Sequence, residues 1–407
     1  MSQNRSTRAT TDAELAFIVE AKESGQYTVN EIAEKFNKKF KRDINYTFIR
    51  NQYDRYKDLF LMDDGHSKVL KSLHRSKAAS SRNAKEVRDI VKAWNQRDDI
   101  LEAINNAVKD ALKSSKTKAK RPKAVKAKKS SKPSMTKELL LSDIHFGKRT
   151  DKFNLEVLKK RLTEVTEVTI KEIERDSTHY NVERIVVAML GDIIESSTMH
   201  GLESAKGCEF GNSMQVYAAI KYLYELVLKP LGEYAQKKGI KIDVPCVTGN
   251  HDRTEPSRTY HNPGEDNLTY IIYNSIKDMC KLSGFNMNFM IPKEPWQIIT
   301  IYNKNVMYEH FDNARSADRK GLETLMSKRT LQLGIPLHFM RGGHFHEPTA
   351  FGYYKIIVNG SLPGNDSFSS VLGFNCEAAQ TLNSYVSTKT RPNPFYKSLV
   401  IQLDHIE

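Results

Sequence analysis

Several short apolar runs in this sequence each end in a glycine-flanked cluster of polar residues, and this recurrence limits the fold more than any other feature. The runs and the clusters that follow them are 139–141 with 142–147, 182–190 with 191–195, and 240–247 with 249–252. The runs have the length and composition of buried strands, and helical patterns at 155–173 and 214–235 separate them. When strands alternate with helices, the carboxyl ends of the strands are where functional side chains collect. The pattern therefore predicts a polar site at one edge of a sheet.

Two further strand patterns end in histidines. Residues 305–309 lead into His310, and residues 336–340 precede the run Gly343-His344-Phe345-His346. A Gly-His-x-His match is expected only about 0.02 times by chance in a chain of this length and composition. Position 310 has no glycine-flanked motif around it, so His261 and His338 are alternatives to His310.

The residue types in these clusters are those that bind divalent metal ions. Carboxylate oxygen, amide oxygen and imidazole nitrogen suit manganese, iron or zinc, and no cysteine is spaced with them to supply a thiolate. A single Asp-x-His triplet is weak evidence, because an isolated aspartate or histidine after a strand is usually a turn cap or an ordinary polar residue. Five such clusters in order favour a metal site.

The order Asp-x-His, Gly-Asp, Gly-Asn-His-Asp, His, Gly-His-x-His resembles the calcineurin-like metallophosphoesterases over about residues 138–365. The resemblance implies an α+β fold, in which a two-sheet β-sandwich is flanked by helices. It also implies two divalent ions that share one carboxylate. The first ion would be held by Asp143, His145, Asp192 and His346, and the second by Asp192 as the bridge, Asn250, His310 and His344.

The same resemblance implies catalytic roles outside the metal ligands. His251 would face the scissile phosphate, where it protonates the leaving oxygen or stabilises the transition state. Glu195 would fix which ring nitrogen of His251 carries the hydrogen, although the family commonly has aspartate at that position. Asp252 would support the metal ligands without binding an ion itself. Arg253 follows on the same loop and is a candidate for binding a substrate phosphate. Manganese is the first choice of metal by resemblance to the nuclease branch, with iron or zinc as alternatives.

The first 67 residues read as a small helical module. Thr11-x-x-Glu14 and Thr28-x-x-Glu31 are capping boxes that begin two helices, and residues 47–60 have the spacing of a third. The region resembles helix-turn-helix modules. The third helix would place Arg50, Asn51, Arg55 and Lys57 against nucleic acid. A three-helix interaction module that binds no DNA explains the same pattern.

Two segments connect this module to the strand-rich part. Residues 68–112 are predicted to form a helical extension with an apolar stripe over 84–112. We expect this stripe to pack against other residues of the same chain, and a homodimer interface is the alternative. Residues 113–137 contain 11 basic and no acidic side chains, so we expect a disordered basic linker. Such a linker would attract polyphosphate, although a solvated spacer has the same composition. The domain expected to carry the metal site is 138–407.

Composition excludes other classes. The chain has 407 residues and a net charge of +14, and none of its apolar runs approaches the roughly 20 residues of a membrane span. Its four cysteines lack metal or redox spacing, and its amino terminus has no apolar leader segment, so we expect a cytoplasmic protein with no membrane partner.

The function predicted first is a DNA phosphodiesterase, an exo- or endonuclease similar to double-strand-break repair nucleases and their phage-encoded relatives. One alternative is a phosphomonoesterase or small-nucleotide phosphodiesterase that the helical module localises. Another is a DNA-binding regulatory protein whose metal domain is structural. The sequence has no ATPase motif, so an ATPase subunit would have to be a separate partner.

Overall fold

The computed structural model describes residues 10–61, 130–199, 205–254, 263–365, 377–387 and 392–407. The predicted helical extension 68–112 and residues 113–129 of the predicted linker lie outside these ranges. The hypotheses of a homodimer and of a disordered basic tether therefore remain predictions. The chain forms two compact units, Met1–Asn95 and Gln96–Glu407, and each is described by itself.

Residues 10–61, the described part of the first unit, form three helices that begin where the sequence predicted. They are α1 (Asp12–Glu23), α2 (Val29–Phe40) and α3 (Tyr46–Leu61). Both capping boxes are formed: the amides of Thr11 and Thr28 each donate to the glutamate three residues later, at 2.7 Å. These bonds satisfy amides that have no partner inside the helix, which is why the two helices begin there.

The three helices pack around a small apolar core. Ile18 from α1, Ile32 and Phe36 from α2, and Ile49 from α3 are fully buried in it. A buried ion pair between Glu14 and Arg42, 3.3 Å apart, adds a polar contact beside this core. The amphipathic stripes read from the sequence thus account for the packing of the first unit.

The second unit is built on two sheets. In spatial order the larger sheet contains β11 (Phe395–Gln402), β10 (Ala379–Val386), β1 (Ser134–Leu141), β2 (Asn181–Met189), β3 (Lys241–Pro245) and β4 (Met287–Met290). The order in the smaller sheet is β5 (Trp296–Ile301), β6 (Lys304–Glu309), β7 (Phe339–Gly342), β9 (Ile356–Val358) and β8 (Thr349–Phe351). Strands β1 to β4 are mutually parallel, and so are β6, β7 and β9.

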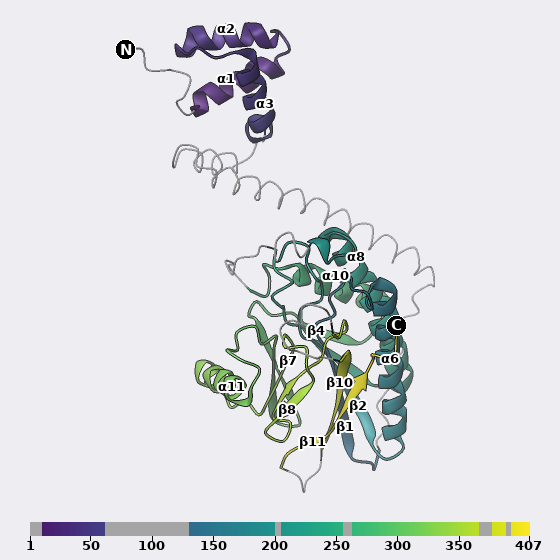
Figure 1. Cartoon of the computed structure of the whole chain (residues 1–407). Coiled ribbons are helices and arrows are strands. Elements are labelled where there is room, and N and C mark those ends of the chain that lie inside the picture. Colours follow the sequence, from purple (N-terminus) through teal and green to yellow (C-terminus); the bar gives the residue numbers. More distant parts are fainter. Residues whose placement is uncertain (1–9, 62–129, 200–204, 255–262, 366–376, 388–391) are drawn as a thin grey trace. The chain divides into compact units, whose positions relative to one another are not determined.

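Helices cover the outer face of each sheet. They are α6 (Leu155–Ser177), α8 (Asn212–Leu223), the π-helix η1 (Tyr224–Leu228), α9 (Lys229–Lys238), α10 (Leu268–Leu282) and α11 (Arg319–Leu333). Figure 1 shows α6 beside the larger sheet and α11 beside the smaller one, with both sheets between them. The prediction of a two-sheet sandwich flanked by helices is confirmed.

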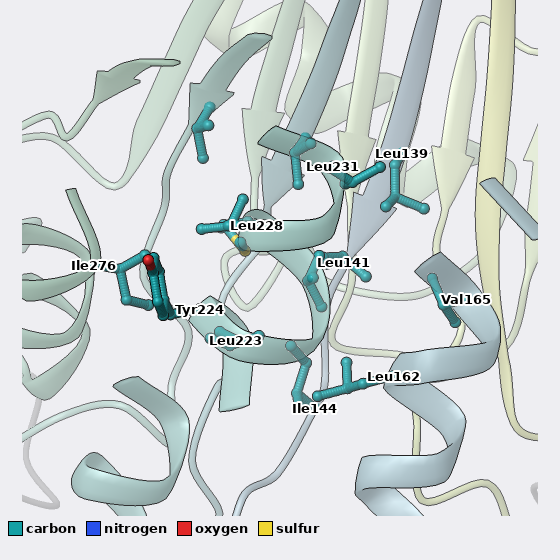
Figure 2. Close-up of a cluster of buried hydrophobic side chains, with 14 of the residues drawn as sticks. Leu139, Leu141, Ile144, Leu162, Val165, Leu223, Tyr224, Leu228, Leu231 and Ile276 are labelled. Atoms are coloured by element: carbon teal, nitrogen blue, oxygen red, sulfur yellow. The ribbon is translucent and has the colours of Figure 1, made fainter. Parts of the chain in front are cut away.

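Strand periodicity explains how one strand serves two cores. Leu139 and Leu141 of β1 face the helices, where they join Leu162 and Val165 of α6 (Figure 2). Leu140, between them, faces the smaller sheet and packs in the core between the two sheets. Because both faces of the strand are buried, residues 139–141 at its end form a continuous apolar run.

The helix predicted at 214–235 extends over α8, η1 and α9 and contains a π-helical turn. Pro230 lies at the start of α9 and has no amide hydrogen to donate to the preceding turn. The π-helical turn immediately before this proline accommodates the missing hydrogen bond. The sequence predicted the helix but not this irregularity.

The predicted boundary at residue 138 is wrong. Strand β1 begins at Ser134, and Met135, Thr136 and Lys137 are buried. Lys137, counted as a linker charge, forms a buried ion pair with Asp176 and also donates to Ser384. Residues 134–137 have the composition of a linker. Their burial could not be read from that composition, because it depends on pairing with β10, a strand that the sequence did not predict.

Within the described ranges, no helix is both long enough and apolar enough to cross a membrane.

Candidate metal centre

The seven predicted ligands come from the ends of five strands. Asp143 and His145 follow β1, Asp192 follows β2, Asn250 follows β3, His310 follows β6, and His344 and His346 follow β7. Strands β1 to β3 are parallel, as are β6 and β7, so the carboxyl ends within each sheet lie along one edge. The structure brings the ends of the two sets together.

Asp143, His145 and His346 form one group, in which the candidate ligand atoms lie within 4.8 Å of one another. His346 Nε2 is 3.2 Å from Asp143 Oδ1 and 3.3 Å from His145 Nε2. Asp143 and His145 are buried, whereas His346 is one quarter exposed. The group therefore matches the ligands predicted for the first ion, apart from the bridge.

Asp192, His310 and His344 form the second group, again within 4.8 Å. His310 Nε2 lies 3.0 Å from Asp192 Oδ2 and 3.2 Å from Asn250 Oδ1. The positions favour His310 over His338 as the candidate ligand, because His338 Nδ1 accepts from the amide of Asn305 at the beginning of β6. His261 lies outside the described residues.

The His310 side chain provides a test of whether a cation fits here. Its Nδ1 is 2.8 Å from the carbonyl oxygen of Leu190, so Nδ1 carries the hydrogen. In the neutral ring Nε2 would then direct a lone pair at two oxygen atoms, those of Asp192 and Asn250. Convergent lone pairs in a buried site need a positive charge, either a proton or a metal ion. The donor set therefore fits a divalent cation.

The electrostatics agree with this conclusion. Burial disfavours the charged form of His310, but the Asp192 carboxylate outweighs it and raises the pKa of His310 to about 10. Burial also opposes ionisation of Asp192, yet His310 and His251 hold its pKa well below the usual range. Without an ion, the proton on His310 balances the aspartate.

We expect metal binding to release that proton. His310 is protonated below about pH 10 in the metal-free protein, so an ion must displace about one proton at pH 8, and apparent affinity should rise with pH. Calorimetric titration of manganese in two buffers with different ionisation enthalpies measures the number of protons released. Binding without proton release at pH 8 would contradict this assignment of His310.

The backbone at the ligands is strained in a consistent way. Five of the seven predicted ligands have positive φ angles, and these are Asp143 (51°), His145 (54°), Asp192 (49°), His344 (75°) and His346 (63°). Positive φ is uncommon outside glycine and costs about 1–3 kcal/mol for each residue. Five residues with this unfavourable conformation in the two ligand groups lower stability, so their clustering indicates a functional site.

Two glycines of the motifs are required by close packing against the carboxylates. A Cβ atom at Gly249 would lie 2.1 Å from Asp192 Oδ1, and one at Gly343 would lie 2.2 Å from Asp143 Oδ2. No flexible neighbour can move to make room, because the contacted atoms belong to the ligands themselves. The glycines therefore allow the loops to approach the two aspartates.

His251 lies beside both groups, as predicted. Its backbone amide donates to Asp192 Oδ1 at 2.8 Å, and its Nδ1 lies 2.7 Å from the carbonyl oxygen of Glu195. Its ring is 4.8 Å from that of His145, between ring centroids, and its side chain is 14% exposed. Burial lowers its basicity, but Asp192 and Glu195 outweigh this and raise the pKa of His251.

Glu195 is close to the site, but its carboxylate has a different neighbour from the one predicted. Oε2 lies 2.7 Å from His145 Nδ1 and 3.9 Å from His251 Nδ1. The backbone carbonyl makes the closer contact with His251, at 2.7 Å, while the carboxylate lies at a long ion-pair distance. Burial would raise the pKa of Glu195, but His145 and Lys148 lower it to about 2.

Asp252 holds the loop that carries Asp192, the predicted bridge. Its two carboxylate oxygens accept from the amides of Asp192, Ile193, Ile194 and Gly249, at 2.8–3.3 Å. Burial and the nearby charge of Asp192 raise its pKa to about 7, while the amide donors oppose the shift. Asp252 is therefore a positioning residue behind Asp192.

Arg253 does not have the exposure expected of a phosphate-binding residue. It is 8% exposed, and its guanidinium donates to Asp312 Oδ2 at 2.7 Å. This ion pair joins the loop of Asn250 to the loop of His310. Asp312 was not among the predicted site residues, although its place two residues after His310 was a usable signal.

The predicted nucleic-acid residues belong to the other unit. Arg50 and Asn51 are exposed on α3, and Arg50 lies 3.9 Å from Asp54. Arg55 and Lys57 are on the same helix, but their side chains lie outside the described part of the structure. Binding of DNA by this surface remains a prediction.

No protein-family model matches the sequence, and no curated protein is significantly similar to it. Among solved structures, Vps29 complexed with zinc from Entamoeba histolytica is 13% identical, with 66% of this chain and 99% of that chain covered and a TM-score of 0.27. A predicted phosphoesterase from Streptococcus pneumoniae is also 13% identical, with 66% and 98% covered and a TM-score of 0.26. A cold-active protein tyrosine phosphatase is 15% identical, with 64% and 82% covered and a TM-score of 0.27. Similarity this weak assigns neither a family nor a function.

Proposed function

We propose that this chain is a dinuclear metal-dependent phosphoesterase. The observation that supports the proposal is the convergence of two ligand groups, one with Asp143 and one with Asp192, at the meeting strand ends of two sheets. The charge of Asp192 acts on His310, His251 and His145, so it reaches side chains of both groups. Such a position suits a carboxylate shared by two ions.

In this proposal Asp143, His145 and His346 would hold one ion, Asn250, His310 and His344 would hold the other, and Asp192 would be shared by both. Two such ions neutralise charge on a phosphoryl group and supply hydroxide at neutral pH. The amide oxygen of Asn250 binds without adding a negative charge, which limits repulsion of an anionic substrate. Manganese is the proposed metal, and zinc or iron fits the same donor set.

His251 is the proposed proton donor to the leaving oxygen. Its amide bond to Asp192 fixes the backbone beside the ions, and the Glu195 carbonyl accepts the hydrogen of Nδ1. The charged ring therefore donates its second hydrogen from Nε2. Despite burial, the carboxylates of Asp192 and Glu195 raise the pKa of His251, which favours the charged form of the ring.

DNA is the proposed substrate, so the reaction would be nuclease cleavage of a phosphodiester, in exo or endo mode. Two features support it: the run of ten basic and no acidic residues over 113–133, which ends before the strand that buries Lys137, and the exposed Arg50 and Asn51 on α3. Hydrolysis of small nucleotides or phosphomonoesters needs neither feature for the reaction itself. A separate ATPase subunit would supply any motor activity.

Replacing His251 with alanine should lower the rate of DNA cleavage about a hundredfold while both ions stay bound, because the residue donates a proton but is not a ligand. Cleavage of end-labelled single- and double-stranded DNA with manganese measures the rate, and elemental analysis measures the bound metal. His179→Ala, a change at an exposed histidine of the same unit, is the matched control and should be without effect.

Other results would point to the other hypotheses. Rapid hydrolysis of small phosphate diesters or monoesters with DNA left intact would replace the nuclease with a phosphatase or nucleotide phosphodiesterase. Metal binding without hydrolysis of any ester would favour a regulatory protein with a structural metal domain.

A further inference from the structure

Glu195 contacts two imidazole rings through two different groups. Its carboxylate Oε2 lies 2.7 Å from His145 Nδ1, and its carbonyl oxygen lies 2.7 Å from His251 Nδ1. His145 Nδ1 and Glu195 Oε2 are both buried, and among the described residues neither atom forms a hydrogen bond of regular geometry, which leaves their 2.7 Å ion-pair contact to match the two atoms. The two atoms therefore depend on each other.

The far side of the His145 ring faces the first ligand group. Its Nε2 is 3.3 Å from His346 Nε2, and the candidate ligand atoms of His145, His346 and Asp143 lie within 4.8 Å of one another. A proton kept on Nδ1 leaves Nε2 with the lone pair that a metal ion needs. A carboxylate next to Nδ1 favours that tautomer.

Glu195 is itself held in place. Five backbone hydrogen bonds of 2.9–3.1 Å join residues 143–146 to residues 191–195, ending with the Glu195 amide donating to the Phe146 carbonyl. Lys148 Nζ lies 3.8 Å from the second carboxylate oxygen. Removal of the side chain would thus leave the loop, and the carbonyl that contacts His251, in position.

We propose that Glu195 is a positioning residue whose carboxylate orients His145 and so sets the affinity of the first ligand group for its metal ion. Of the two Glu195 groups, the carbonyl alone orients His251. The inference rests on the proposed dinuclear site but not on hydrolysis. It departs from the sequence prediction, in which the carboxylate served His251.

The test is titration of the metal-free protein with manganese, with binding monitored by calorimetry and by electron paramagnetic resonance. Glu195→Ala should weaken the ion of the first group about 10–100-fold, the usual loss when the partner behind a ligand is removed, and leave the second ion unchanged. Glu195→Gln keeps an oxygen acceptor of the same shape and should retain most of the affinity. His346→Ala and His344→Ala identify which binding step belongs to which group.

Asp151→Ala, at an exposed carboxylate six residues after His145, is the control for loss of charge. Equal losses in Glu195→Gln and Glu195→Ala would overturn the proposal, because they would make Glu195 a ligand or a needed charge. Unchanged manganese binding in both variants would also overturn it. If the parent protein hydrolyses no phosphate ester but the binding pattern is as expected, the proposed function fails and the role of Glu195 stands.

Discussion

Asp192→Asn should abolish paired metal binding and lower phosphoesterase activity about a thousandfold or more. Two ions supply several kcal/mol of transition-state stabilisation, and each tenfold in rate corresponds to about 1.4 kcal/mol. The asparagine keeps the Oδ1 acceptor for the His251 amide, so the loop should hold its shape. What it loses is the negative charge that faces His310 at 3.0 Å.

Metal content, hydrolysis rate and thermal stability together check this expectation. Manganese at a hundred times its dissociation constant should stabilise the parent protein by about 2.7 kcal/mol, and the Asp192→Asn protein by much less. Asp278→Asn, at an exposed aspartate of α10, should behave as the parent does. If Asp192→Asn still bound two ions with parental affinity, Asp192 would not be the shared ligand.

The largest effect on folding should come from a buried ion pair between the two sheets. Glu138 of β1 and Arg341 of β7 are fully buried, with Arg341 Nε 3.1 Å from Glu138 Oε2. Glu138 also accepts from Tyr308, Tyr385 and Asn383, at 2.6–2.8 Å. Arg341→Met would leave the carboxylate buried without its countercharge, so it should lower the free energy of unfolding by about 3–5 kcal/mol.

Urea unfolding of the metal-free protein measures the loss. The double variant Glu138→Gln with Arg341→Met should lose less than the sum of the two single changes, because no unpaired charge remains. Arg319→Met removes an exposed pair with Glu323 at 2.8 Å and should cost at most about 1 kcal/mol. Equal losses at the buried and exposed pairs would show that the network between the sheets does not stabilise the fold.

Much of the architecture follows from local patterns. The two capping boxes begin α1 and α2, and the residues after β1, β2 and β7 include the ligands that the motifs predicted. These features depend on neighbours three or four residues away, or on the alternation of a single strand, and such short-range signals are present in the sequence. Strands β4, β5, β8 and β10 have weaker patterns and were not predicted.

The composition and order of the polar clusters were enough to predict which side chains lie together as candidate ligands of a cation. Residue type determines which atoms can bind a metal ion, and the carboxyl ends of parallel strands meet at one edge of a sheet. Which atoms meet was decided by the tertiary structure. The Glu195 carboxylate turns to His145 instead of His251, Arg253 pairs with Asp312 instead of facing solvent, and Lys137 is buried against Asp176. Each of these contacts joins residues more than 35 positions apart in the chain, so its distance and burial depend on how whole strands and loops pack, which no local period encodes.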